Sequence, residues 1–367
     1  MILPFLFPLS AVRSLKNVYY ASPLYRLTFR DIPPHSLKPF APVLRPGDPS
    51  LGRAIVEGSF LLMKKQAYLG ESPWLNLPVG IEAGAQLNGF SWLADLIALG
   101  SEEAQKKAHA LTRQWIEAHG RWSELAWRPD VIGRRLSAWL SAYAYLSEND
   151  DDLKNALLAS MMMQARHLGR SCATASSGAP AFAAVQGLLF AAVCLPGAEG
   201  LLGGAFNILK REIESQVLPD GGHRDRNPSL QLVLLDDLCD IRDLLRTAQV
   251  EIPSELQGAI DRMAPMLRAL RHGDGGLALF NGGFEETCAA IDMVLARSGV
   301  RGRALSSAPH SGFQRLAGGR TVIIADAGTL SFEMSSAKHR LVVNCGSAAG
   351  DGKTWRDAME TTAAHST

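Results

Sequence analysis

The chain has 367 residues, 47% of them hydrophobic, so it is long enough for two domains with a large core. Its 37 basic and 36 acidic residues leave a net charge of +1, which excludes the basic excess of a typical nucleic-acid-binding protein. The five cysteines lie far apart without a CxxC pair, which favours buried free thiols over a disulfide framework or a zinc site.

Residues 1–48 predict an extended N-terminal arm rather than a folded domain. They are rich in proline and irregular, with three clustered tyrosines at Tyr19, Tyr20 and Tyr25. The apolar start MILPFLFPLSAV holds two prolines and no early Lys or Arg, which is a poor signal peptide and too short to span a bilayer. No membrane span is therefore expected, and the cytoplasm and the cell envelope or periplasm both stay open as the location.

Residues 49–300 predict a helical domain of roughly ten helices, some amphipathic and some apolar all round, as paired inner and outer layers require. A first helix is expected over Leu51–Leu69, and Ser101 is placed to cap a later one. Ala179–Leu195 is nearly all apolar and predicts a buried inner helix. Pro265 should kink or shorten its helix. The remaining helices are expected near 90–97, 104–115, 136–143, 151–161, 205–216, 229–246, 254–270 and 285–297.

Residues 301–367 predict the beginning of an antiparallel β-sandwich. Three runs read as strands, at Thr321–Ala325, Leu330–Glu333 and Arg340–Asn344, and an Asp-Ala-Gly turn separates the first two. This region is about 65 residues long, whereas a β-sandwich usually needs about 100. We therefore expect a β-domain that is truncated.

The stretch from Val217 to Leu230, VLPDGGHRDRNPSL, contains the densest polar run between two apolar segments. A Pro-Asp-Gly-Gly turn signal is followed by five consecutive polar residues from His223 to Asn227, which are costly to bury unpaired. One interpretation is a solvated loop between helices. The other is a loop that presents His and Arg to an anionic ligand, since Arg binds carboxylate or sulfate bidentately.

The same stretch carries a family resemblance. With GDGGLALFNGG (273–283), SGFQRLAGGRTVIIADAG (311–328), LVVNCG (341–346) and TAAHST (362–367), it resembles the heparinase II/III-like polysaccharide lyases. The resemblance implies a mainly α fold, with an α/α-toroid followed by an antiparallel β-sandwich. It also implies cleavage of uronic-acid polysaccharides by β-elimination. Family members continue past TAAHST, so the chain would be truncated in its β-domain.

β-Elimination beside a uronate needs a group that neutralises the carboxylate, a base and an acid. The resemblance implies that His365, in TAAHST, and His223 are catalytic. Arg224, Arg226 and Asn227 are predicted to grip a carboxylate or sulfate of the substrate. The alternative for these three is capping and bridging around the start of the next helix. We expect no cofactor and no metal ligand.

A second candidate binding surface combines Trp127 with Arg134 and Arg135. Sugar rings stack on aromatic faces and Arg contacts acidic groups, so these residues could form a sugar platform with cationic edges. However, Trp at helical spacing is more often part of the core, and that interpretation stays open.

The chain departs from the family pattern at two places that bear on catalysis. Family lyases usually show an Asn-His pair before the apolar inner helix, but Ser171–Val185 contains neither residue, and no Tyr follows Tyr145. A non-catalytic homologue that binds acidic glycan is therefore the main alternative. In either case the expected partner is an acidic polysaccharide, and the oligomeric state stays open.

Other enzyme classes receive less support from the sequence. A toroid glycoside hydrolase would need paired carboxylates, but Asp236, Asp240 and Asp243 share one helix face beside arginines, which favours a salt-bridged surface. The chain has no G-x-S-x-G elbow, P-loop or H-E-x-x-H motif.

Overall fold

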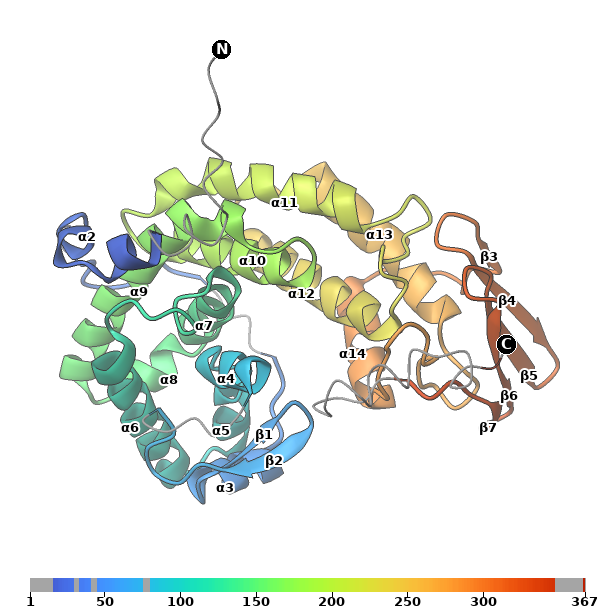
Figure 1. Ribbon diagram of the computed structural model, residues 1–367, viewed down its shortest axis with the longest axis horizontal. Coiled ribbons are helices and arrows are strands. Elements are labelled where there is room, and N and C mark those ends of the chain that lie inside the picture. The colour runs from blue at the N-terminus through green and yellow to red at the C-terminus, as the bar shows by residue number, and fades with distance from the viewer. Residues whose placement is uncertain (1–15, 30–32, 41–44, 75–79, 347–365, 367) are drawn as a thin grey trace, which may run out of the picture. The chain divides into compact units, whose positions relative to one another are not determined.

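A computed structural model describes residues 16–29, 33–40, 45–74, 80–346 and 366 (Figure 1). The chain forms two compact units. The first unit comprises Met1–Ala175 and Gln186–Leu202, and the second comprises Ser176–Val185 and Gly203–Thr367. The predicted order of a mainly helical region followed by antiparallel strands is confirmed. The second unit holds both helices and the sheet, and so it does not locate a boundary between them. The predicted domain boundary near residue 300 therefore stays a prediction.

The first unit consists of helices and one β-hairpin. Ser101 caps helix α6 (Glu102–His119), as predicted. Its hydroxyl accepts a hydrogen bond of 3.1 Å from the Ala104 N–H. The elements are α2 (Pro23–Leu27), α3 (Pro49–Val56), β1 (Ser59–Leu62), β2 (Lys65–Tyr68), α4 (Ile81–Asn88), α5 (Leu93–Leu99), α6 (Glu102–His119), α7 (Pro129–Ser141), α8 (Tyr143–Ser147), α9 (Asp151–Ser171), η1 (Cys172–Thr174) and η2 (Glu199–Leu201), with the C-terminal part of α10 (Ala179–Cys194).

The predicted helix over Leu51–Leu69 is wrong beyond Val56. The chain instead forms the antiparallel hairpin β1–β2, whose turn residues Met63 and Lys64 both have positive φ, 48° and 59°. Paired positive-φ residues are the turn that matches the twist of a two-residue hairpin. Phe60 and Leu62 are buried while Leu61 between them is exposed, which is the alternation of a strand rather than a helical period.

Part of the N-terminal arm, residues 16–21 and 23–27, is helical where an extended segment was predicted. Residues 16–21 and α2 form short helices, and the tyrosine rings gather around Tyr25. Tyr25 is buried, and its hydroxyl oxygen lies 2.7 Å from Nδ1 of His167 on α9 in a hydrogen bond. The guanidinium of Arg170 lies over the Tyr25 ring, 5.4 Å from its centroid. The arm is therefore attached to α9 by specific polar contacts.

The buried side chain of His167 should make the protein less stable in acid. Burial is the main cause that lowers its pKa from 6.5 to about 4, and the charge of Arg170 adds to it. Between those pH values the unfolded chain binds a proton at His167 that the folded chain does not, so stability falls as the pH falls. Protonation of this one group should lower the free energy of unfolding by about 3 kcal/mol between pH 7 and pH 4. Urea unfolding from pH 7 to pH 4 should show a smaller loss in His167→Phe than in the parent, and equal losses would contradict the assignment.

The described part of the second unit combines helices α11 to α14 and the N-terminal part of α10 with a five-stranded sheet. Helix α12 contacts both α13 and α14. Pro265 lies inside α13, which runs past it, so the proline does not shorten that helix. The elements are the N-terminal part of α10, α11 (Leu202–Gln216), α12 (Pro228–Thr247), α13 (Ser254–Ala269), α14 (Cys288–Ser298), β3 (Ser307–Ala308), β4 (Phe313–Gly318), β5 (Thr321–Asp326), β6 (Ser331–Ser336) and β7 (His339–Val342).

The five strands are antiparallel neighbours in chain order (Figure 1). The three predicted strands correspond to β5, β6 and β7, whereas β3 and β4 were not predicted. One face of the sheet is buried and includes polar side chains. The opposite face exposes apolar residues, among them Leu316 (65% exposed) and Leu341 (58%).

A buried histidine and carboxylate tie the sheet to the segment after α13. His272 Nε2 lies 2.9 Å from Glu333 Oε2, and its Nδ1 lies 3.1 Å from the Ser335 hydroxyl. The other oxygen of Glu333 accepts from the Leu279 N–H and from the backbone and side chain of Asn344. Both oxygens of the carboxylate are hydrogen-bonded inside the protein, which is what a buried polar group requires.

All five cysteines are free thiols. Cys172, Cys194 and Cys239 are buried as predicted, but Cys288 and Cys345 are exposed. Within the described part of the chain, no helix combines the length and the hydropathy needed to cross a bilayer.

Candidate functional site

The stretch from Val217 to Leu230 is a tightly folded loop of the second unit rather than a loosely solvated one. Val217 and His223 form an antiparallel bridge. Gly221 has φ 83°, and a side chain there would collide with the backbone of α13. The Asp220 carboxylate accepts from the backbone and the hydroxyl of Ser311, at 2.7 and 3.1 Å. The loop is therefore fixed to both α13 and the turn before β4.

His223 was predicted to be presented by this loop to an anionic ligand, but only 3% of the residue is exposed. Its backbone N–H donates to Gln231 Oε1 at 2.6 Å. Its Nδ1 accepts from the Asp225 N–H at 3.1 Å, which assigns the proton of the neutral ring to Nε2. Burial lowers the pKa of His223 and the Asp225 carboxylate opposes this shift, so the ring is a neutral N–H donor near pH 7.

Arg226 was predicted to grip a ligand, but its guanidinium is paired with the fully buried carboxylate of Asp326 on β5. Asn281 completes the contact, since its side-chain amide donates 2.9 Å bonds to both Asp326 and the Arg226 carbonyl. The guanidinium also covers Gly328, where a side chain would collide with it. A buried carboxylate needs a cation, and Arg226 supplies it here. The predicted role of Arg226 in substrate binding stays a prediction.

Asn227 serves as the N-cap of α12, the alternative given for it above. Its side-chain oxygen accepts from the N–H groups of Ser229 and Leu230, at 2.8 and 3.1 Å. Its amide group donates to the Asn281 carbonyl at 2.9 Å. These bonds use the polar atoms of the side chain within the protein.

Arg224 is the one arginine of this loop that remains exposed. Its Nη1 donates to the Ser215 carbonyl at 3.2 Å, and its backbone pairs with Gln216. Gln216 donates to the Ser177 hydroxyl at 2.9 Å, and that hydroxyl donates to the buried Glu212 at 3.1 Å. We call Ser177, Glu212, Gln216 and Arg224 the Arg224 cluster.

Sequence reasoning did not select Ser177, Glu212 or Gln216. One signal pointed to the place, because Ser177 lies in the Ser171–Val185 segment where the resemblance requires an Asn-His pair. The structure brings Ser177 beside the predicted loop, in the same unit, through its bond with Gln216. The cluster offers one exposed cation, one buried carboxylate and neutral hydrogen-bonding groups.

His365 lies outside the described residues, so the prediction for it stays a prediction. Its neighbour Ser366 is described. The Ser366 N–H donates to Asn344 Oδ1 at 3.1 Å, and its carbonyl accepts from the Phe332 N–H at 3.2 Å.

Arg135, predicted at the edge of a sugar platform, lies in the core of the first unit and is 0% exposed. Its guanidinium donates to Gln164 Oε1, the Asn88 carbonyl and the Ala126 carbonyl at 2.8 to 2.9 Å. It also stacks over Trp115, 3.9 Å from the ring centroid. Burial lowers the pKa of Arg135 well below its ordinary value. A guanidinium enclosed in this way has no face left for a polysaccharide.

The platform prediction is also wrong for Trp127, which is buried and donates from Nε1 to the His119 carbonyl at 2.9 Å. Arg134 is half-buried, and its Nη1 donates to Gln186 Oε1 at 3.1 Å. Of the three residues, only Arg134 keeps surface that a ligand could reach.

The acidic face of α12 is a salt-bridged surface, as the sequence favoured. Arg297 on α14 contacts all three carboxylates of that face, those of Asp236, Asp240 and Asp243. Arg242 and Arg246 of the same helix also contact Asp243, at 2.9 and 3.9 Å, as the sequence suggested. The partner on the other helix was not predicted, because it is not visible in local spacing. With their charge compensated, these residues give no support to a glycoside hydrolase site. Among the described residues, no group of three or more His, Cys, Asp or Glu side chains suits a metal ion.

Two family models match the chain and together cover most of it. Heparinase II/III N-terminus matches residues 53–297, and Heparinase II/III-like, C-terminal matches residues 300–367. The chain belongs to the heparinase II/III-like family.

A curated protein to which the chain is similar is FtsZ-localized protein C from Caulobacter vibrioides. It is 31% identical over 328 residues, which cover 85% of this chain, and the chain spans 56% of that protein's length. Among solved structures, a heparinase III matches with a TM-score of 0.69 at 14% identity, over 98% of this chain and 68% of the other. Heparan sulfate lyase HepC from Pedobacter heparinus matches with a TM-score of 0.58 at 19% identity, over 96% and 64%. The protein thus has a heparinase III-like fold.

Proposed function

We propose that this protein binds an acidic, uronate-containing polysaccharide and cleaves it by β-elimination. The observation that carries the proposal is the match of both heparinase II/III family models, one for each part of the chain, together with the heparinase III-like fold. The solved relatives share less than a fifth of their residues with this chain, so they support the fold and not the substrate.

The loop geometry suggests how the roles would be divided. Arg224 is exposed and would contact the uronate carboxylate, because a guanidinium binds a carboxylate with two parallel bonds. His223 is 3% exposed, so a role for it requires that its remaining N–H, on Nε2, reaches the substrate. It would then donate to the developing negative charge, since its Nδ1 already accepts from Asp225. In this tautomer a neutral His223 cannot also accept a proton at Nε2. A base must therefore come from elsewhere, and we propose His365 for that role.

A second candidate is a homologue that binds acidic glycan without cleaving it. It is favoured because no Tyr follows Tyr145 and because Ser171–Val185 lacks the Asn-His pair. It is also favoured because Arg226 is committed to Asp326. The curated relative is named for its localisation with FtsZ. Under this second candidate function, we propose that this chain also localises with FtsZ. A fluorescent fusion that fails to coincide with FtsZ in dividing cells would remove the extension.

The two candidates differ in a direct measurement. The protein is incubated with heparan sulfate, hyaluronan, alginate and polygalacturonate, and the ultraviolet absorbance of newly formed unsaturated uronate ends is followed. β-Elimination produces this absorbance, whereas hydrolysis and simple binding do not. A rise with one polymer supports the lyase. Saturable binding with no rise supports the non-catalytic homologue, and no binding to any polymer contradicts both.

Arg224→Ala should weaken acidic-glycan binding by about tenfold, which is about 1.4 kcal/mol, because an exposed charge-assisted contact is lost. The melting temperature should change little, since the side chain is exposed. Titration calorimetry with the polymer identified above measures the effect. Arg246→Ala is the matched control, an exposed arginine on α12. An equal loss in the two variants would show general charge attraction rather than a site.

A further inference from the structure

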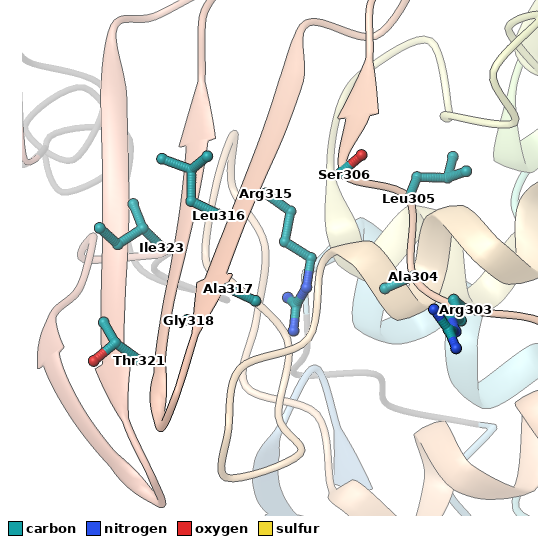
Figure 2. A pocket seen from close by; sticks show the side chains of 10 residues that line it. All are labelled: Arg303, Ala304, Leu305, Ser306, Arg315, Leu316, Ala317, Gly318, Thr321 and Ile323. Atoms are coloured by element: carbon teal, nitrogen blue, oxygen red, sulfur yellow. The ribbon is translucent and has the colours of Figure 1, made fainter.

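A groove of about 730 Å³ lies along one side of β4 in the second unit. Segment Arg303–Ser306 forms one wall, and β4 residues Arg315–Gly318 form the other, with Thr321 and Ile323 of β5 behind them (Figure 2). Figure 2 shows Arg315 extending from β4 toward the side of the Arg303 segment, while Leu316 and Ile323 point away from that side. The volume is in the range of ligand-binding pockets.

The groove exists because the outer neighbour of β4 ends early. β3 pairs only Ser307 and Ala308 with β4, and the last bond on that side runs from the Arg315 N–H to the Ser306 carbonyl at 2.8 Å. Residues two apart in a strand direct their backbone groups to the same side. The N–H and C=O of Ala317 therefore face the groove, and among the described residues none bonds to them there. An open strand edge of this kind accepts an additional strand.

The two faces of this edge differ in chemistry. Arg315 lies on the buried face and donates only to the carbonyls of Ala269 and Arg271. Burial lowers the pKa of Arg315, as expected for a cation that has lost water without gaining an opposite charge. Arg303 on the facing wall is exposed, and neither arginine has a carboxylate partner within the described residues. The other face offers Leu316, which is 65% exposed, and Ile323.

The backbone edge and the side chains of the groove indicate which kind of molecule binds there. The two lining arginines would also suit an acidic glycan, but the free N–H and C=O of Ala317 match a polypeptide backbone, and no lining residue is aromatic for a sugar ring to stack on. A second copy of the chain would bring Arg303 and Arg315 against the same arginines, and like charges at a strand edge repel. An extended polypeptide satisfies the backbone groups, and alternating acidic and apolar side chains match the two faces.

We propose that the open edge of β4, between Arg315–Gly318 and Arg303–Ser306, binds an extended acidic segment of a partner protein as an added β-strand. In the added strand, acidic side chains meet Arg315 on one face and apolar side chains meet Leu316 on the other. This site is separate in its chemistry from the proposed glycan site at Arg224.

The probe is a short fluorescein-labelled peptide of alternating glutamate and valine, titrated with the full chain by fluorescence anisotropy. Saturable binding is expected. A peptide with lysine in place of glutamate should not bind, because Arg303 and Arg315 repel it. The acidic peptide with alternate backbone amides N-methylated should also lose binding, because it cannot donate to the β4 edge.

Leu316→Glu should weaken binding of the acidic peptide by at least about tenfold, since it places a negative charge beside the added strand. Leu341→Glu is the matched control, an exposed leucine on β7 at the other end of the sheet, and should not change binding. Ala317→Pro, which removes the free edge N–H, is a second blocking variant. Arg224→Ala should leave peptide binding intact, which separates this proposal from the glycan site.

Three results would overturn the proposal. Equal binding of the methylated and unmethylated peptides would exclude strand addition. Binding of heparan sulfate oligosaccharides that is lost in Leu316→Glu, with no peptide binding, would make the groove a glycan site. A dimer in sedimentation that dissociates in Leu316→Glu would make the occupant a second copy.

Discussion

Arg135→Ala is expected to lower the free energy of unfolding by about 3–5 kcal/mol, the largest stability loss predicted for the first unit. The variant leaves the Asn88 and Ala126 carbonyls and the Gln164 side chain buried without their donor. It also leaves a cavity beside Trp115, against which the guanidinium stacks. Urea denaturation followed by tryptophan fluorescence measures the loss.

The neighbouring arginine provides the control for this prediction. Arg134→Ala removes a half-buried side chain and should cost about 1 kcal/mol or less. Arg135→Lys should recover little of the loss, because one ammonium group cannot reach three acceptors that a planar guanidinium reaches in different directions. If Arg135→Ala were as mild as Arg134→Ala, the enclosed guanidinium would not support this core.

Glu333→Ala is expected to destabilise the second unit by about 3–5 kcal/mol, because it removes one partner of a fully buried pair. His272 would lose the acceptor at 2.9 Å, and the Leu279 N–H and Asn344 would lose theirs. The sheet and the segment after α13 would then be joined by fewer bonds. Guanidinium denaturation monitored by circular dichroism gives the free energy.

Two further variants test the cause of that loss. Glu333→Gln keeps one acceptor oxygen for the Leu279 N–H and should lose less than the alanine variant. Met334→Ala changes the next residue of β6, whose side chain lies on the opposite face, and should have a smaller effect. A loss in Met334→Ala that matches Glu333→Ala would attribute the effect to the strand and not to the carboxylate.

Whether a sequence prediction succeeded depends on how far apart along the chain the interacting residues lie. The cap at Ser101 was predictable because the bond spans three residues. The hairpin after Val56 was missed because SFLLMKKQAY has no Gly, Asn or Pro at its turn, where Met63 and Lys64 take positive φ. The acidic face of α12 was recognised, but its partner Arg297 was not, since it lies on another helix.

For the candidate site, the sequence alone determined that the stretch from Val217 to Leu230 concentrates charge and turn residues, and that it resembles a family loop. Only the tertiary structure decided which of its cations remain available. Arg226 is taken by Asp326, a residue 100 positions later, while Arg224 stays exposed. The physical reason is that burial of a carboxylate requires a cation wherever the fold brings one near. Local spacing records which groups are charged, and long-range packing assigns their partners.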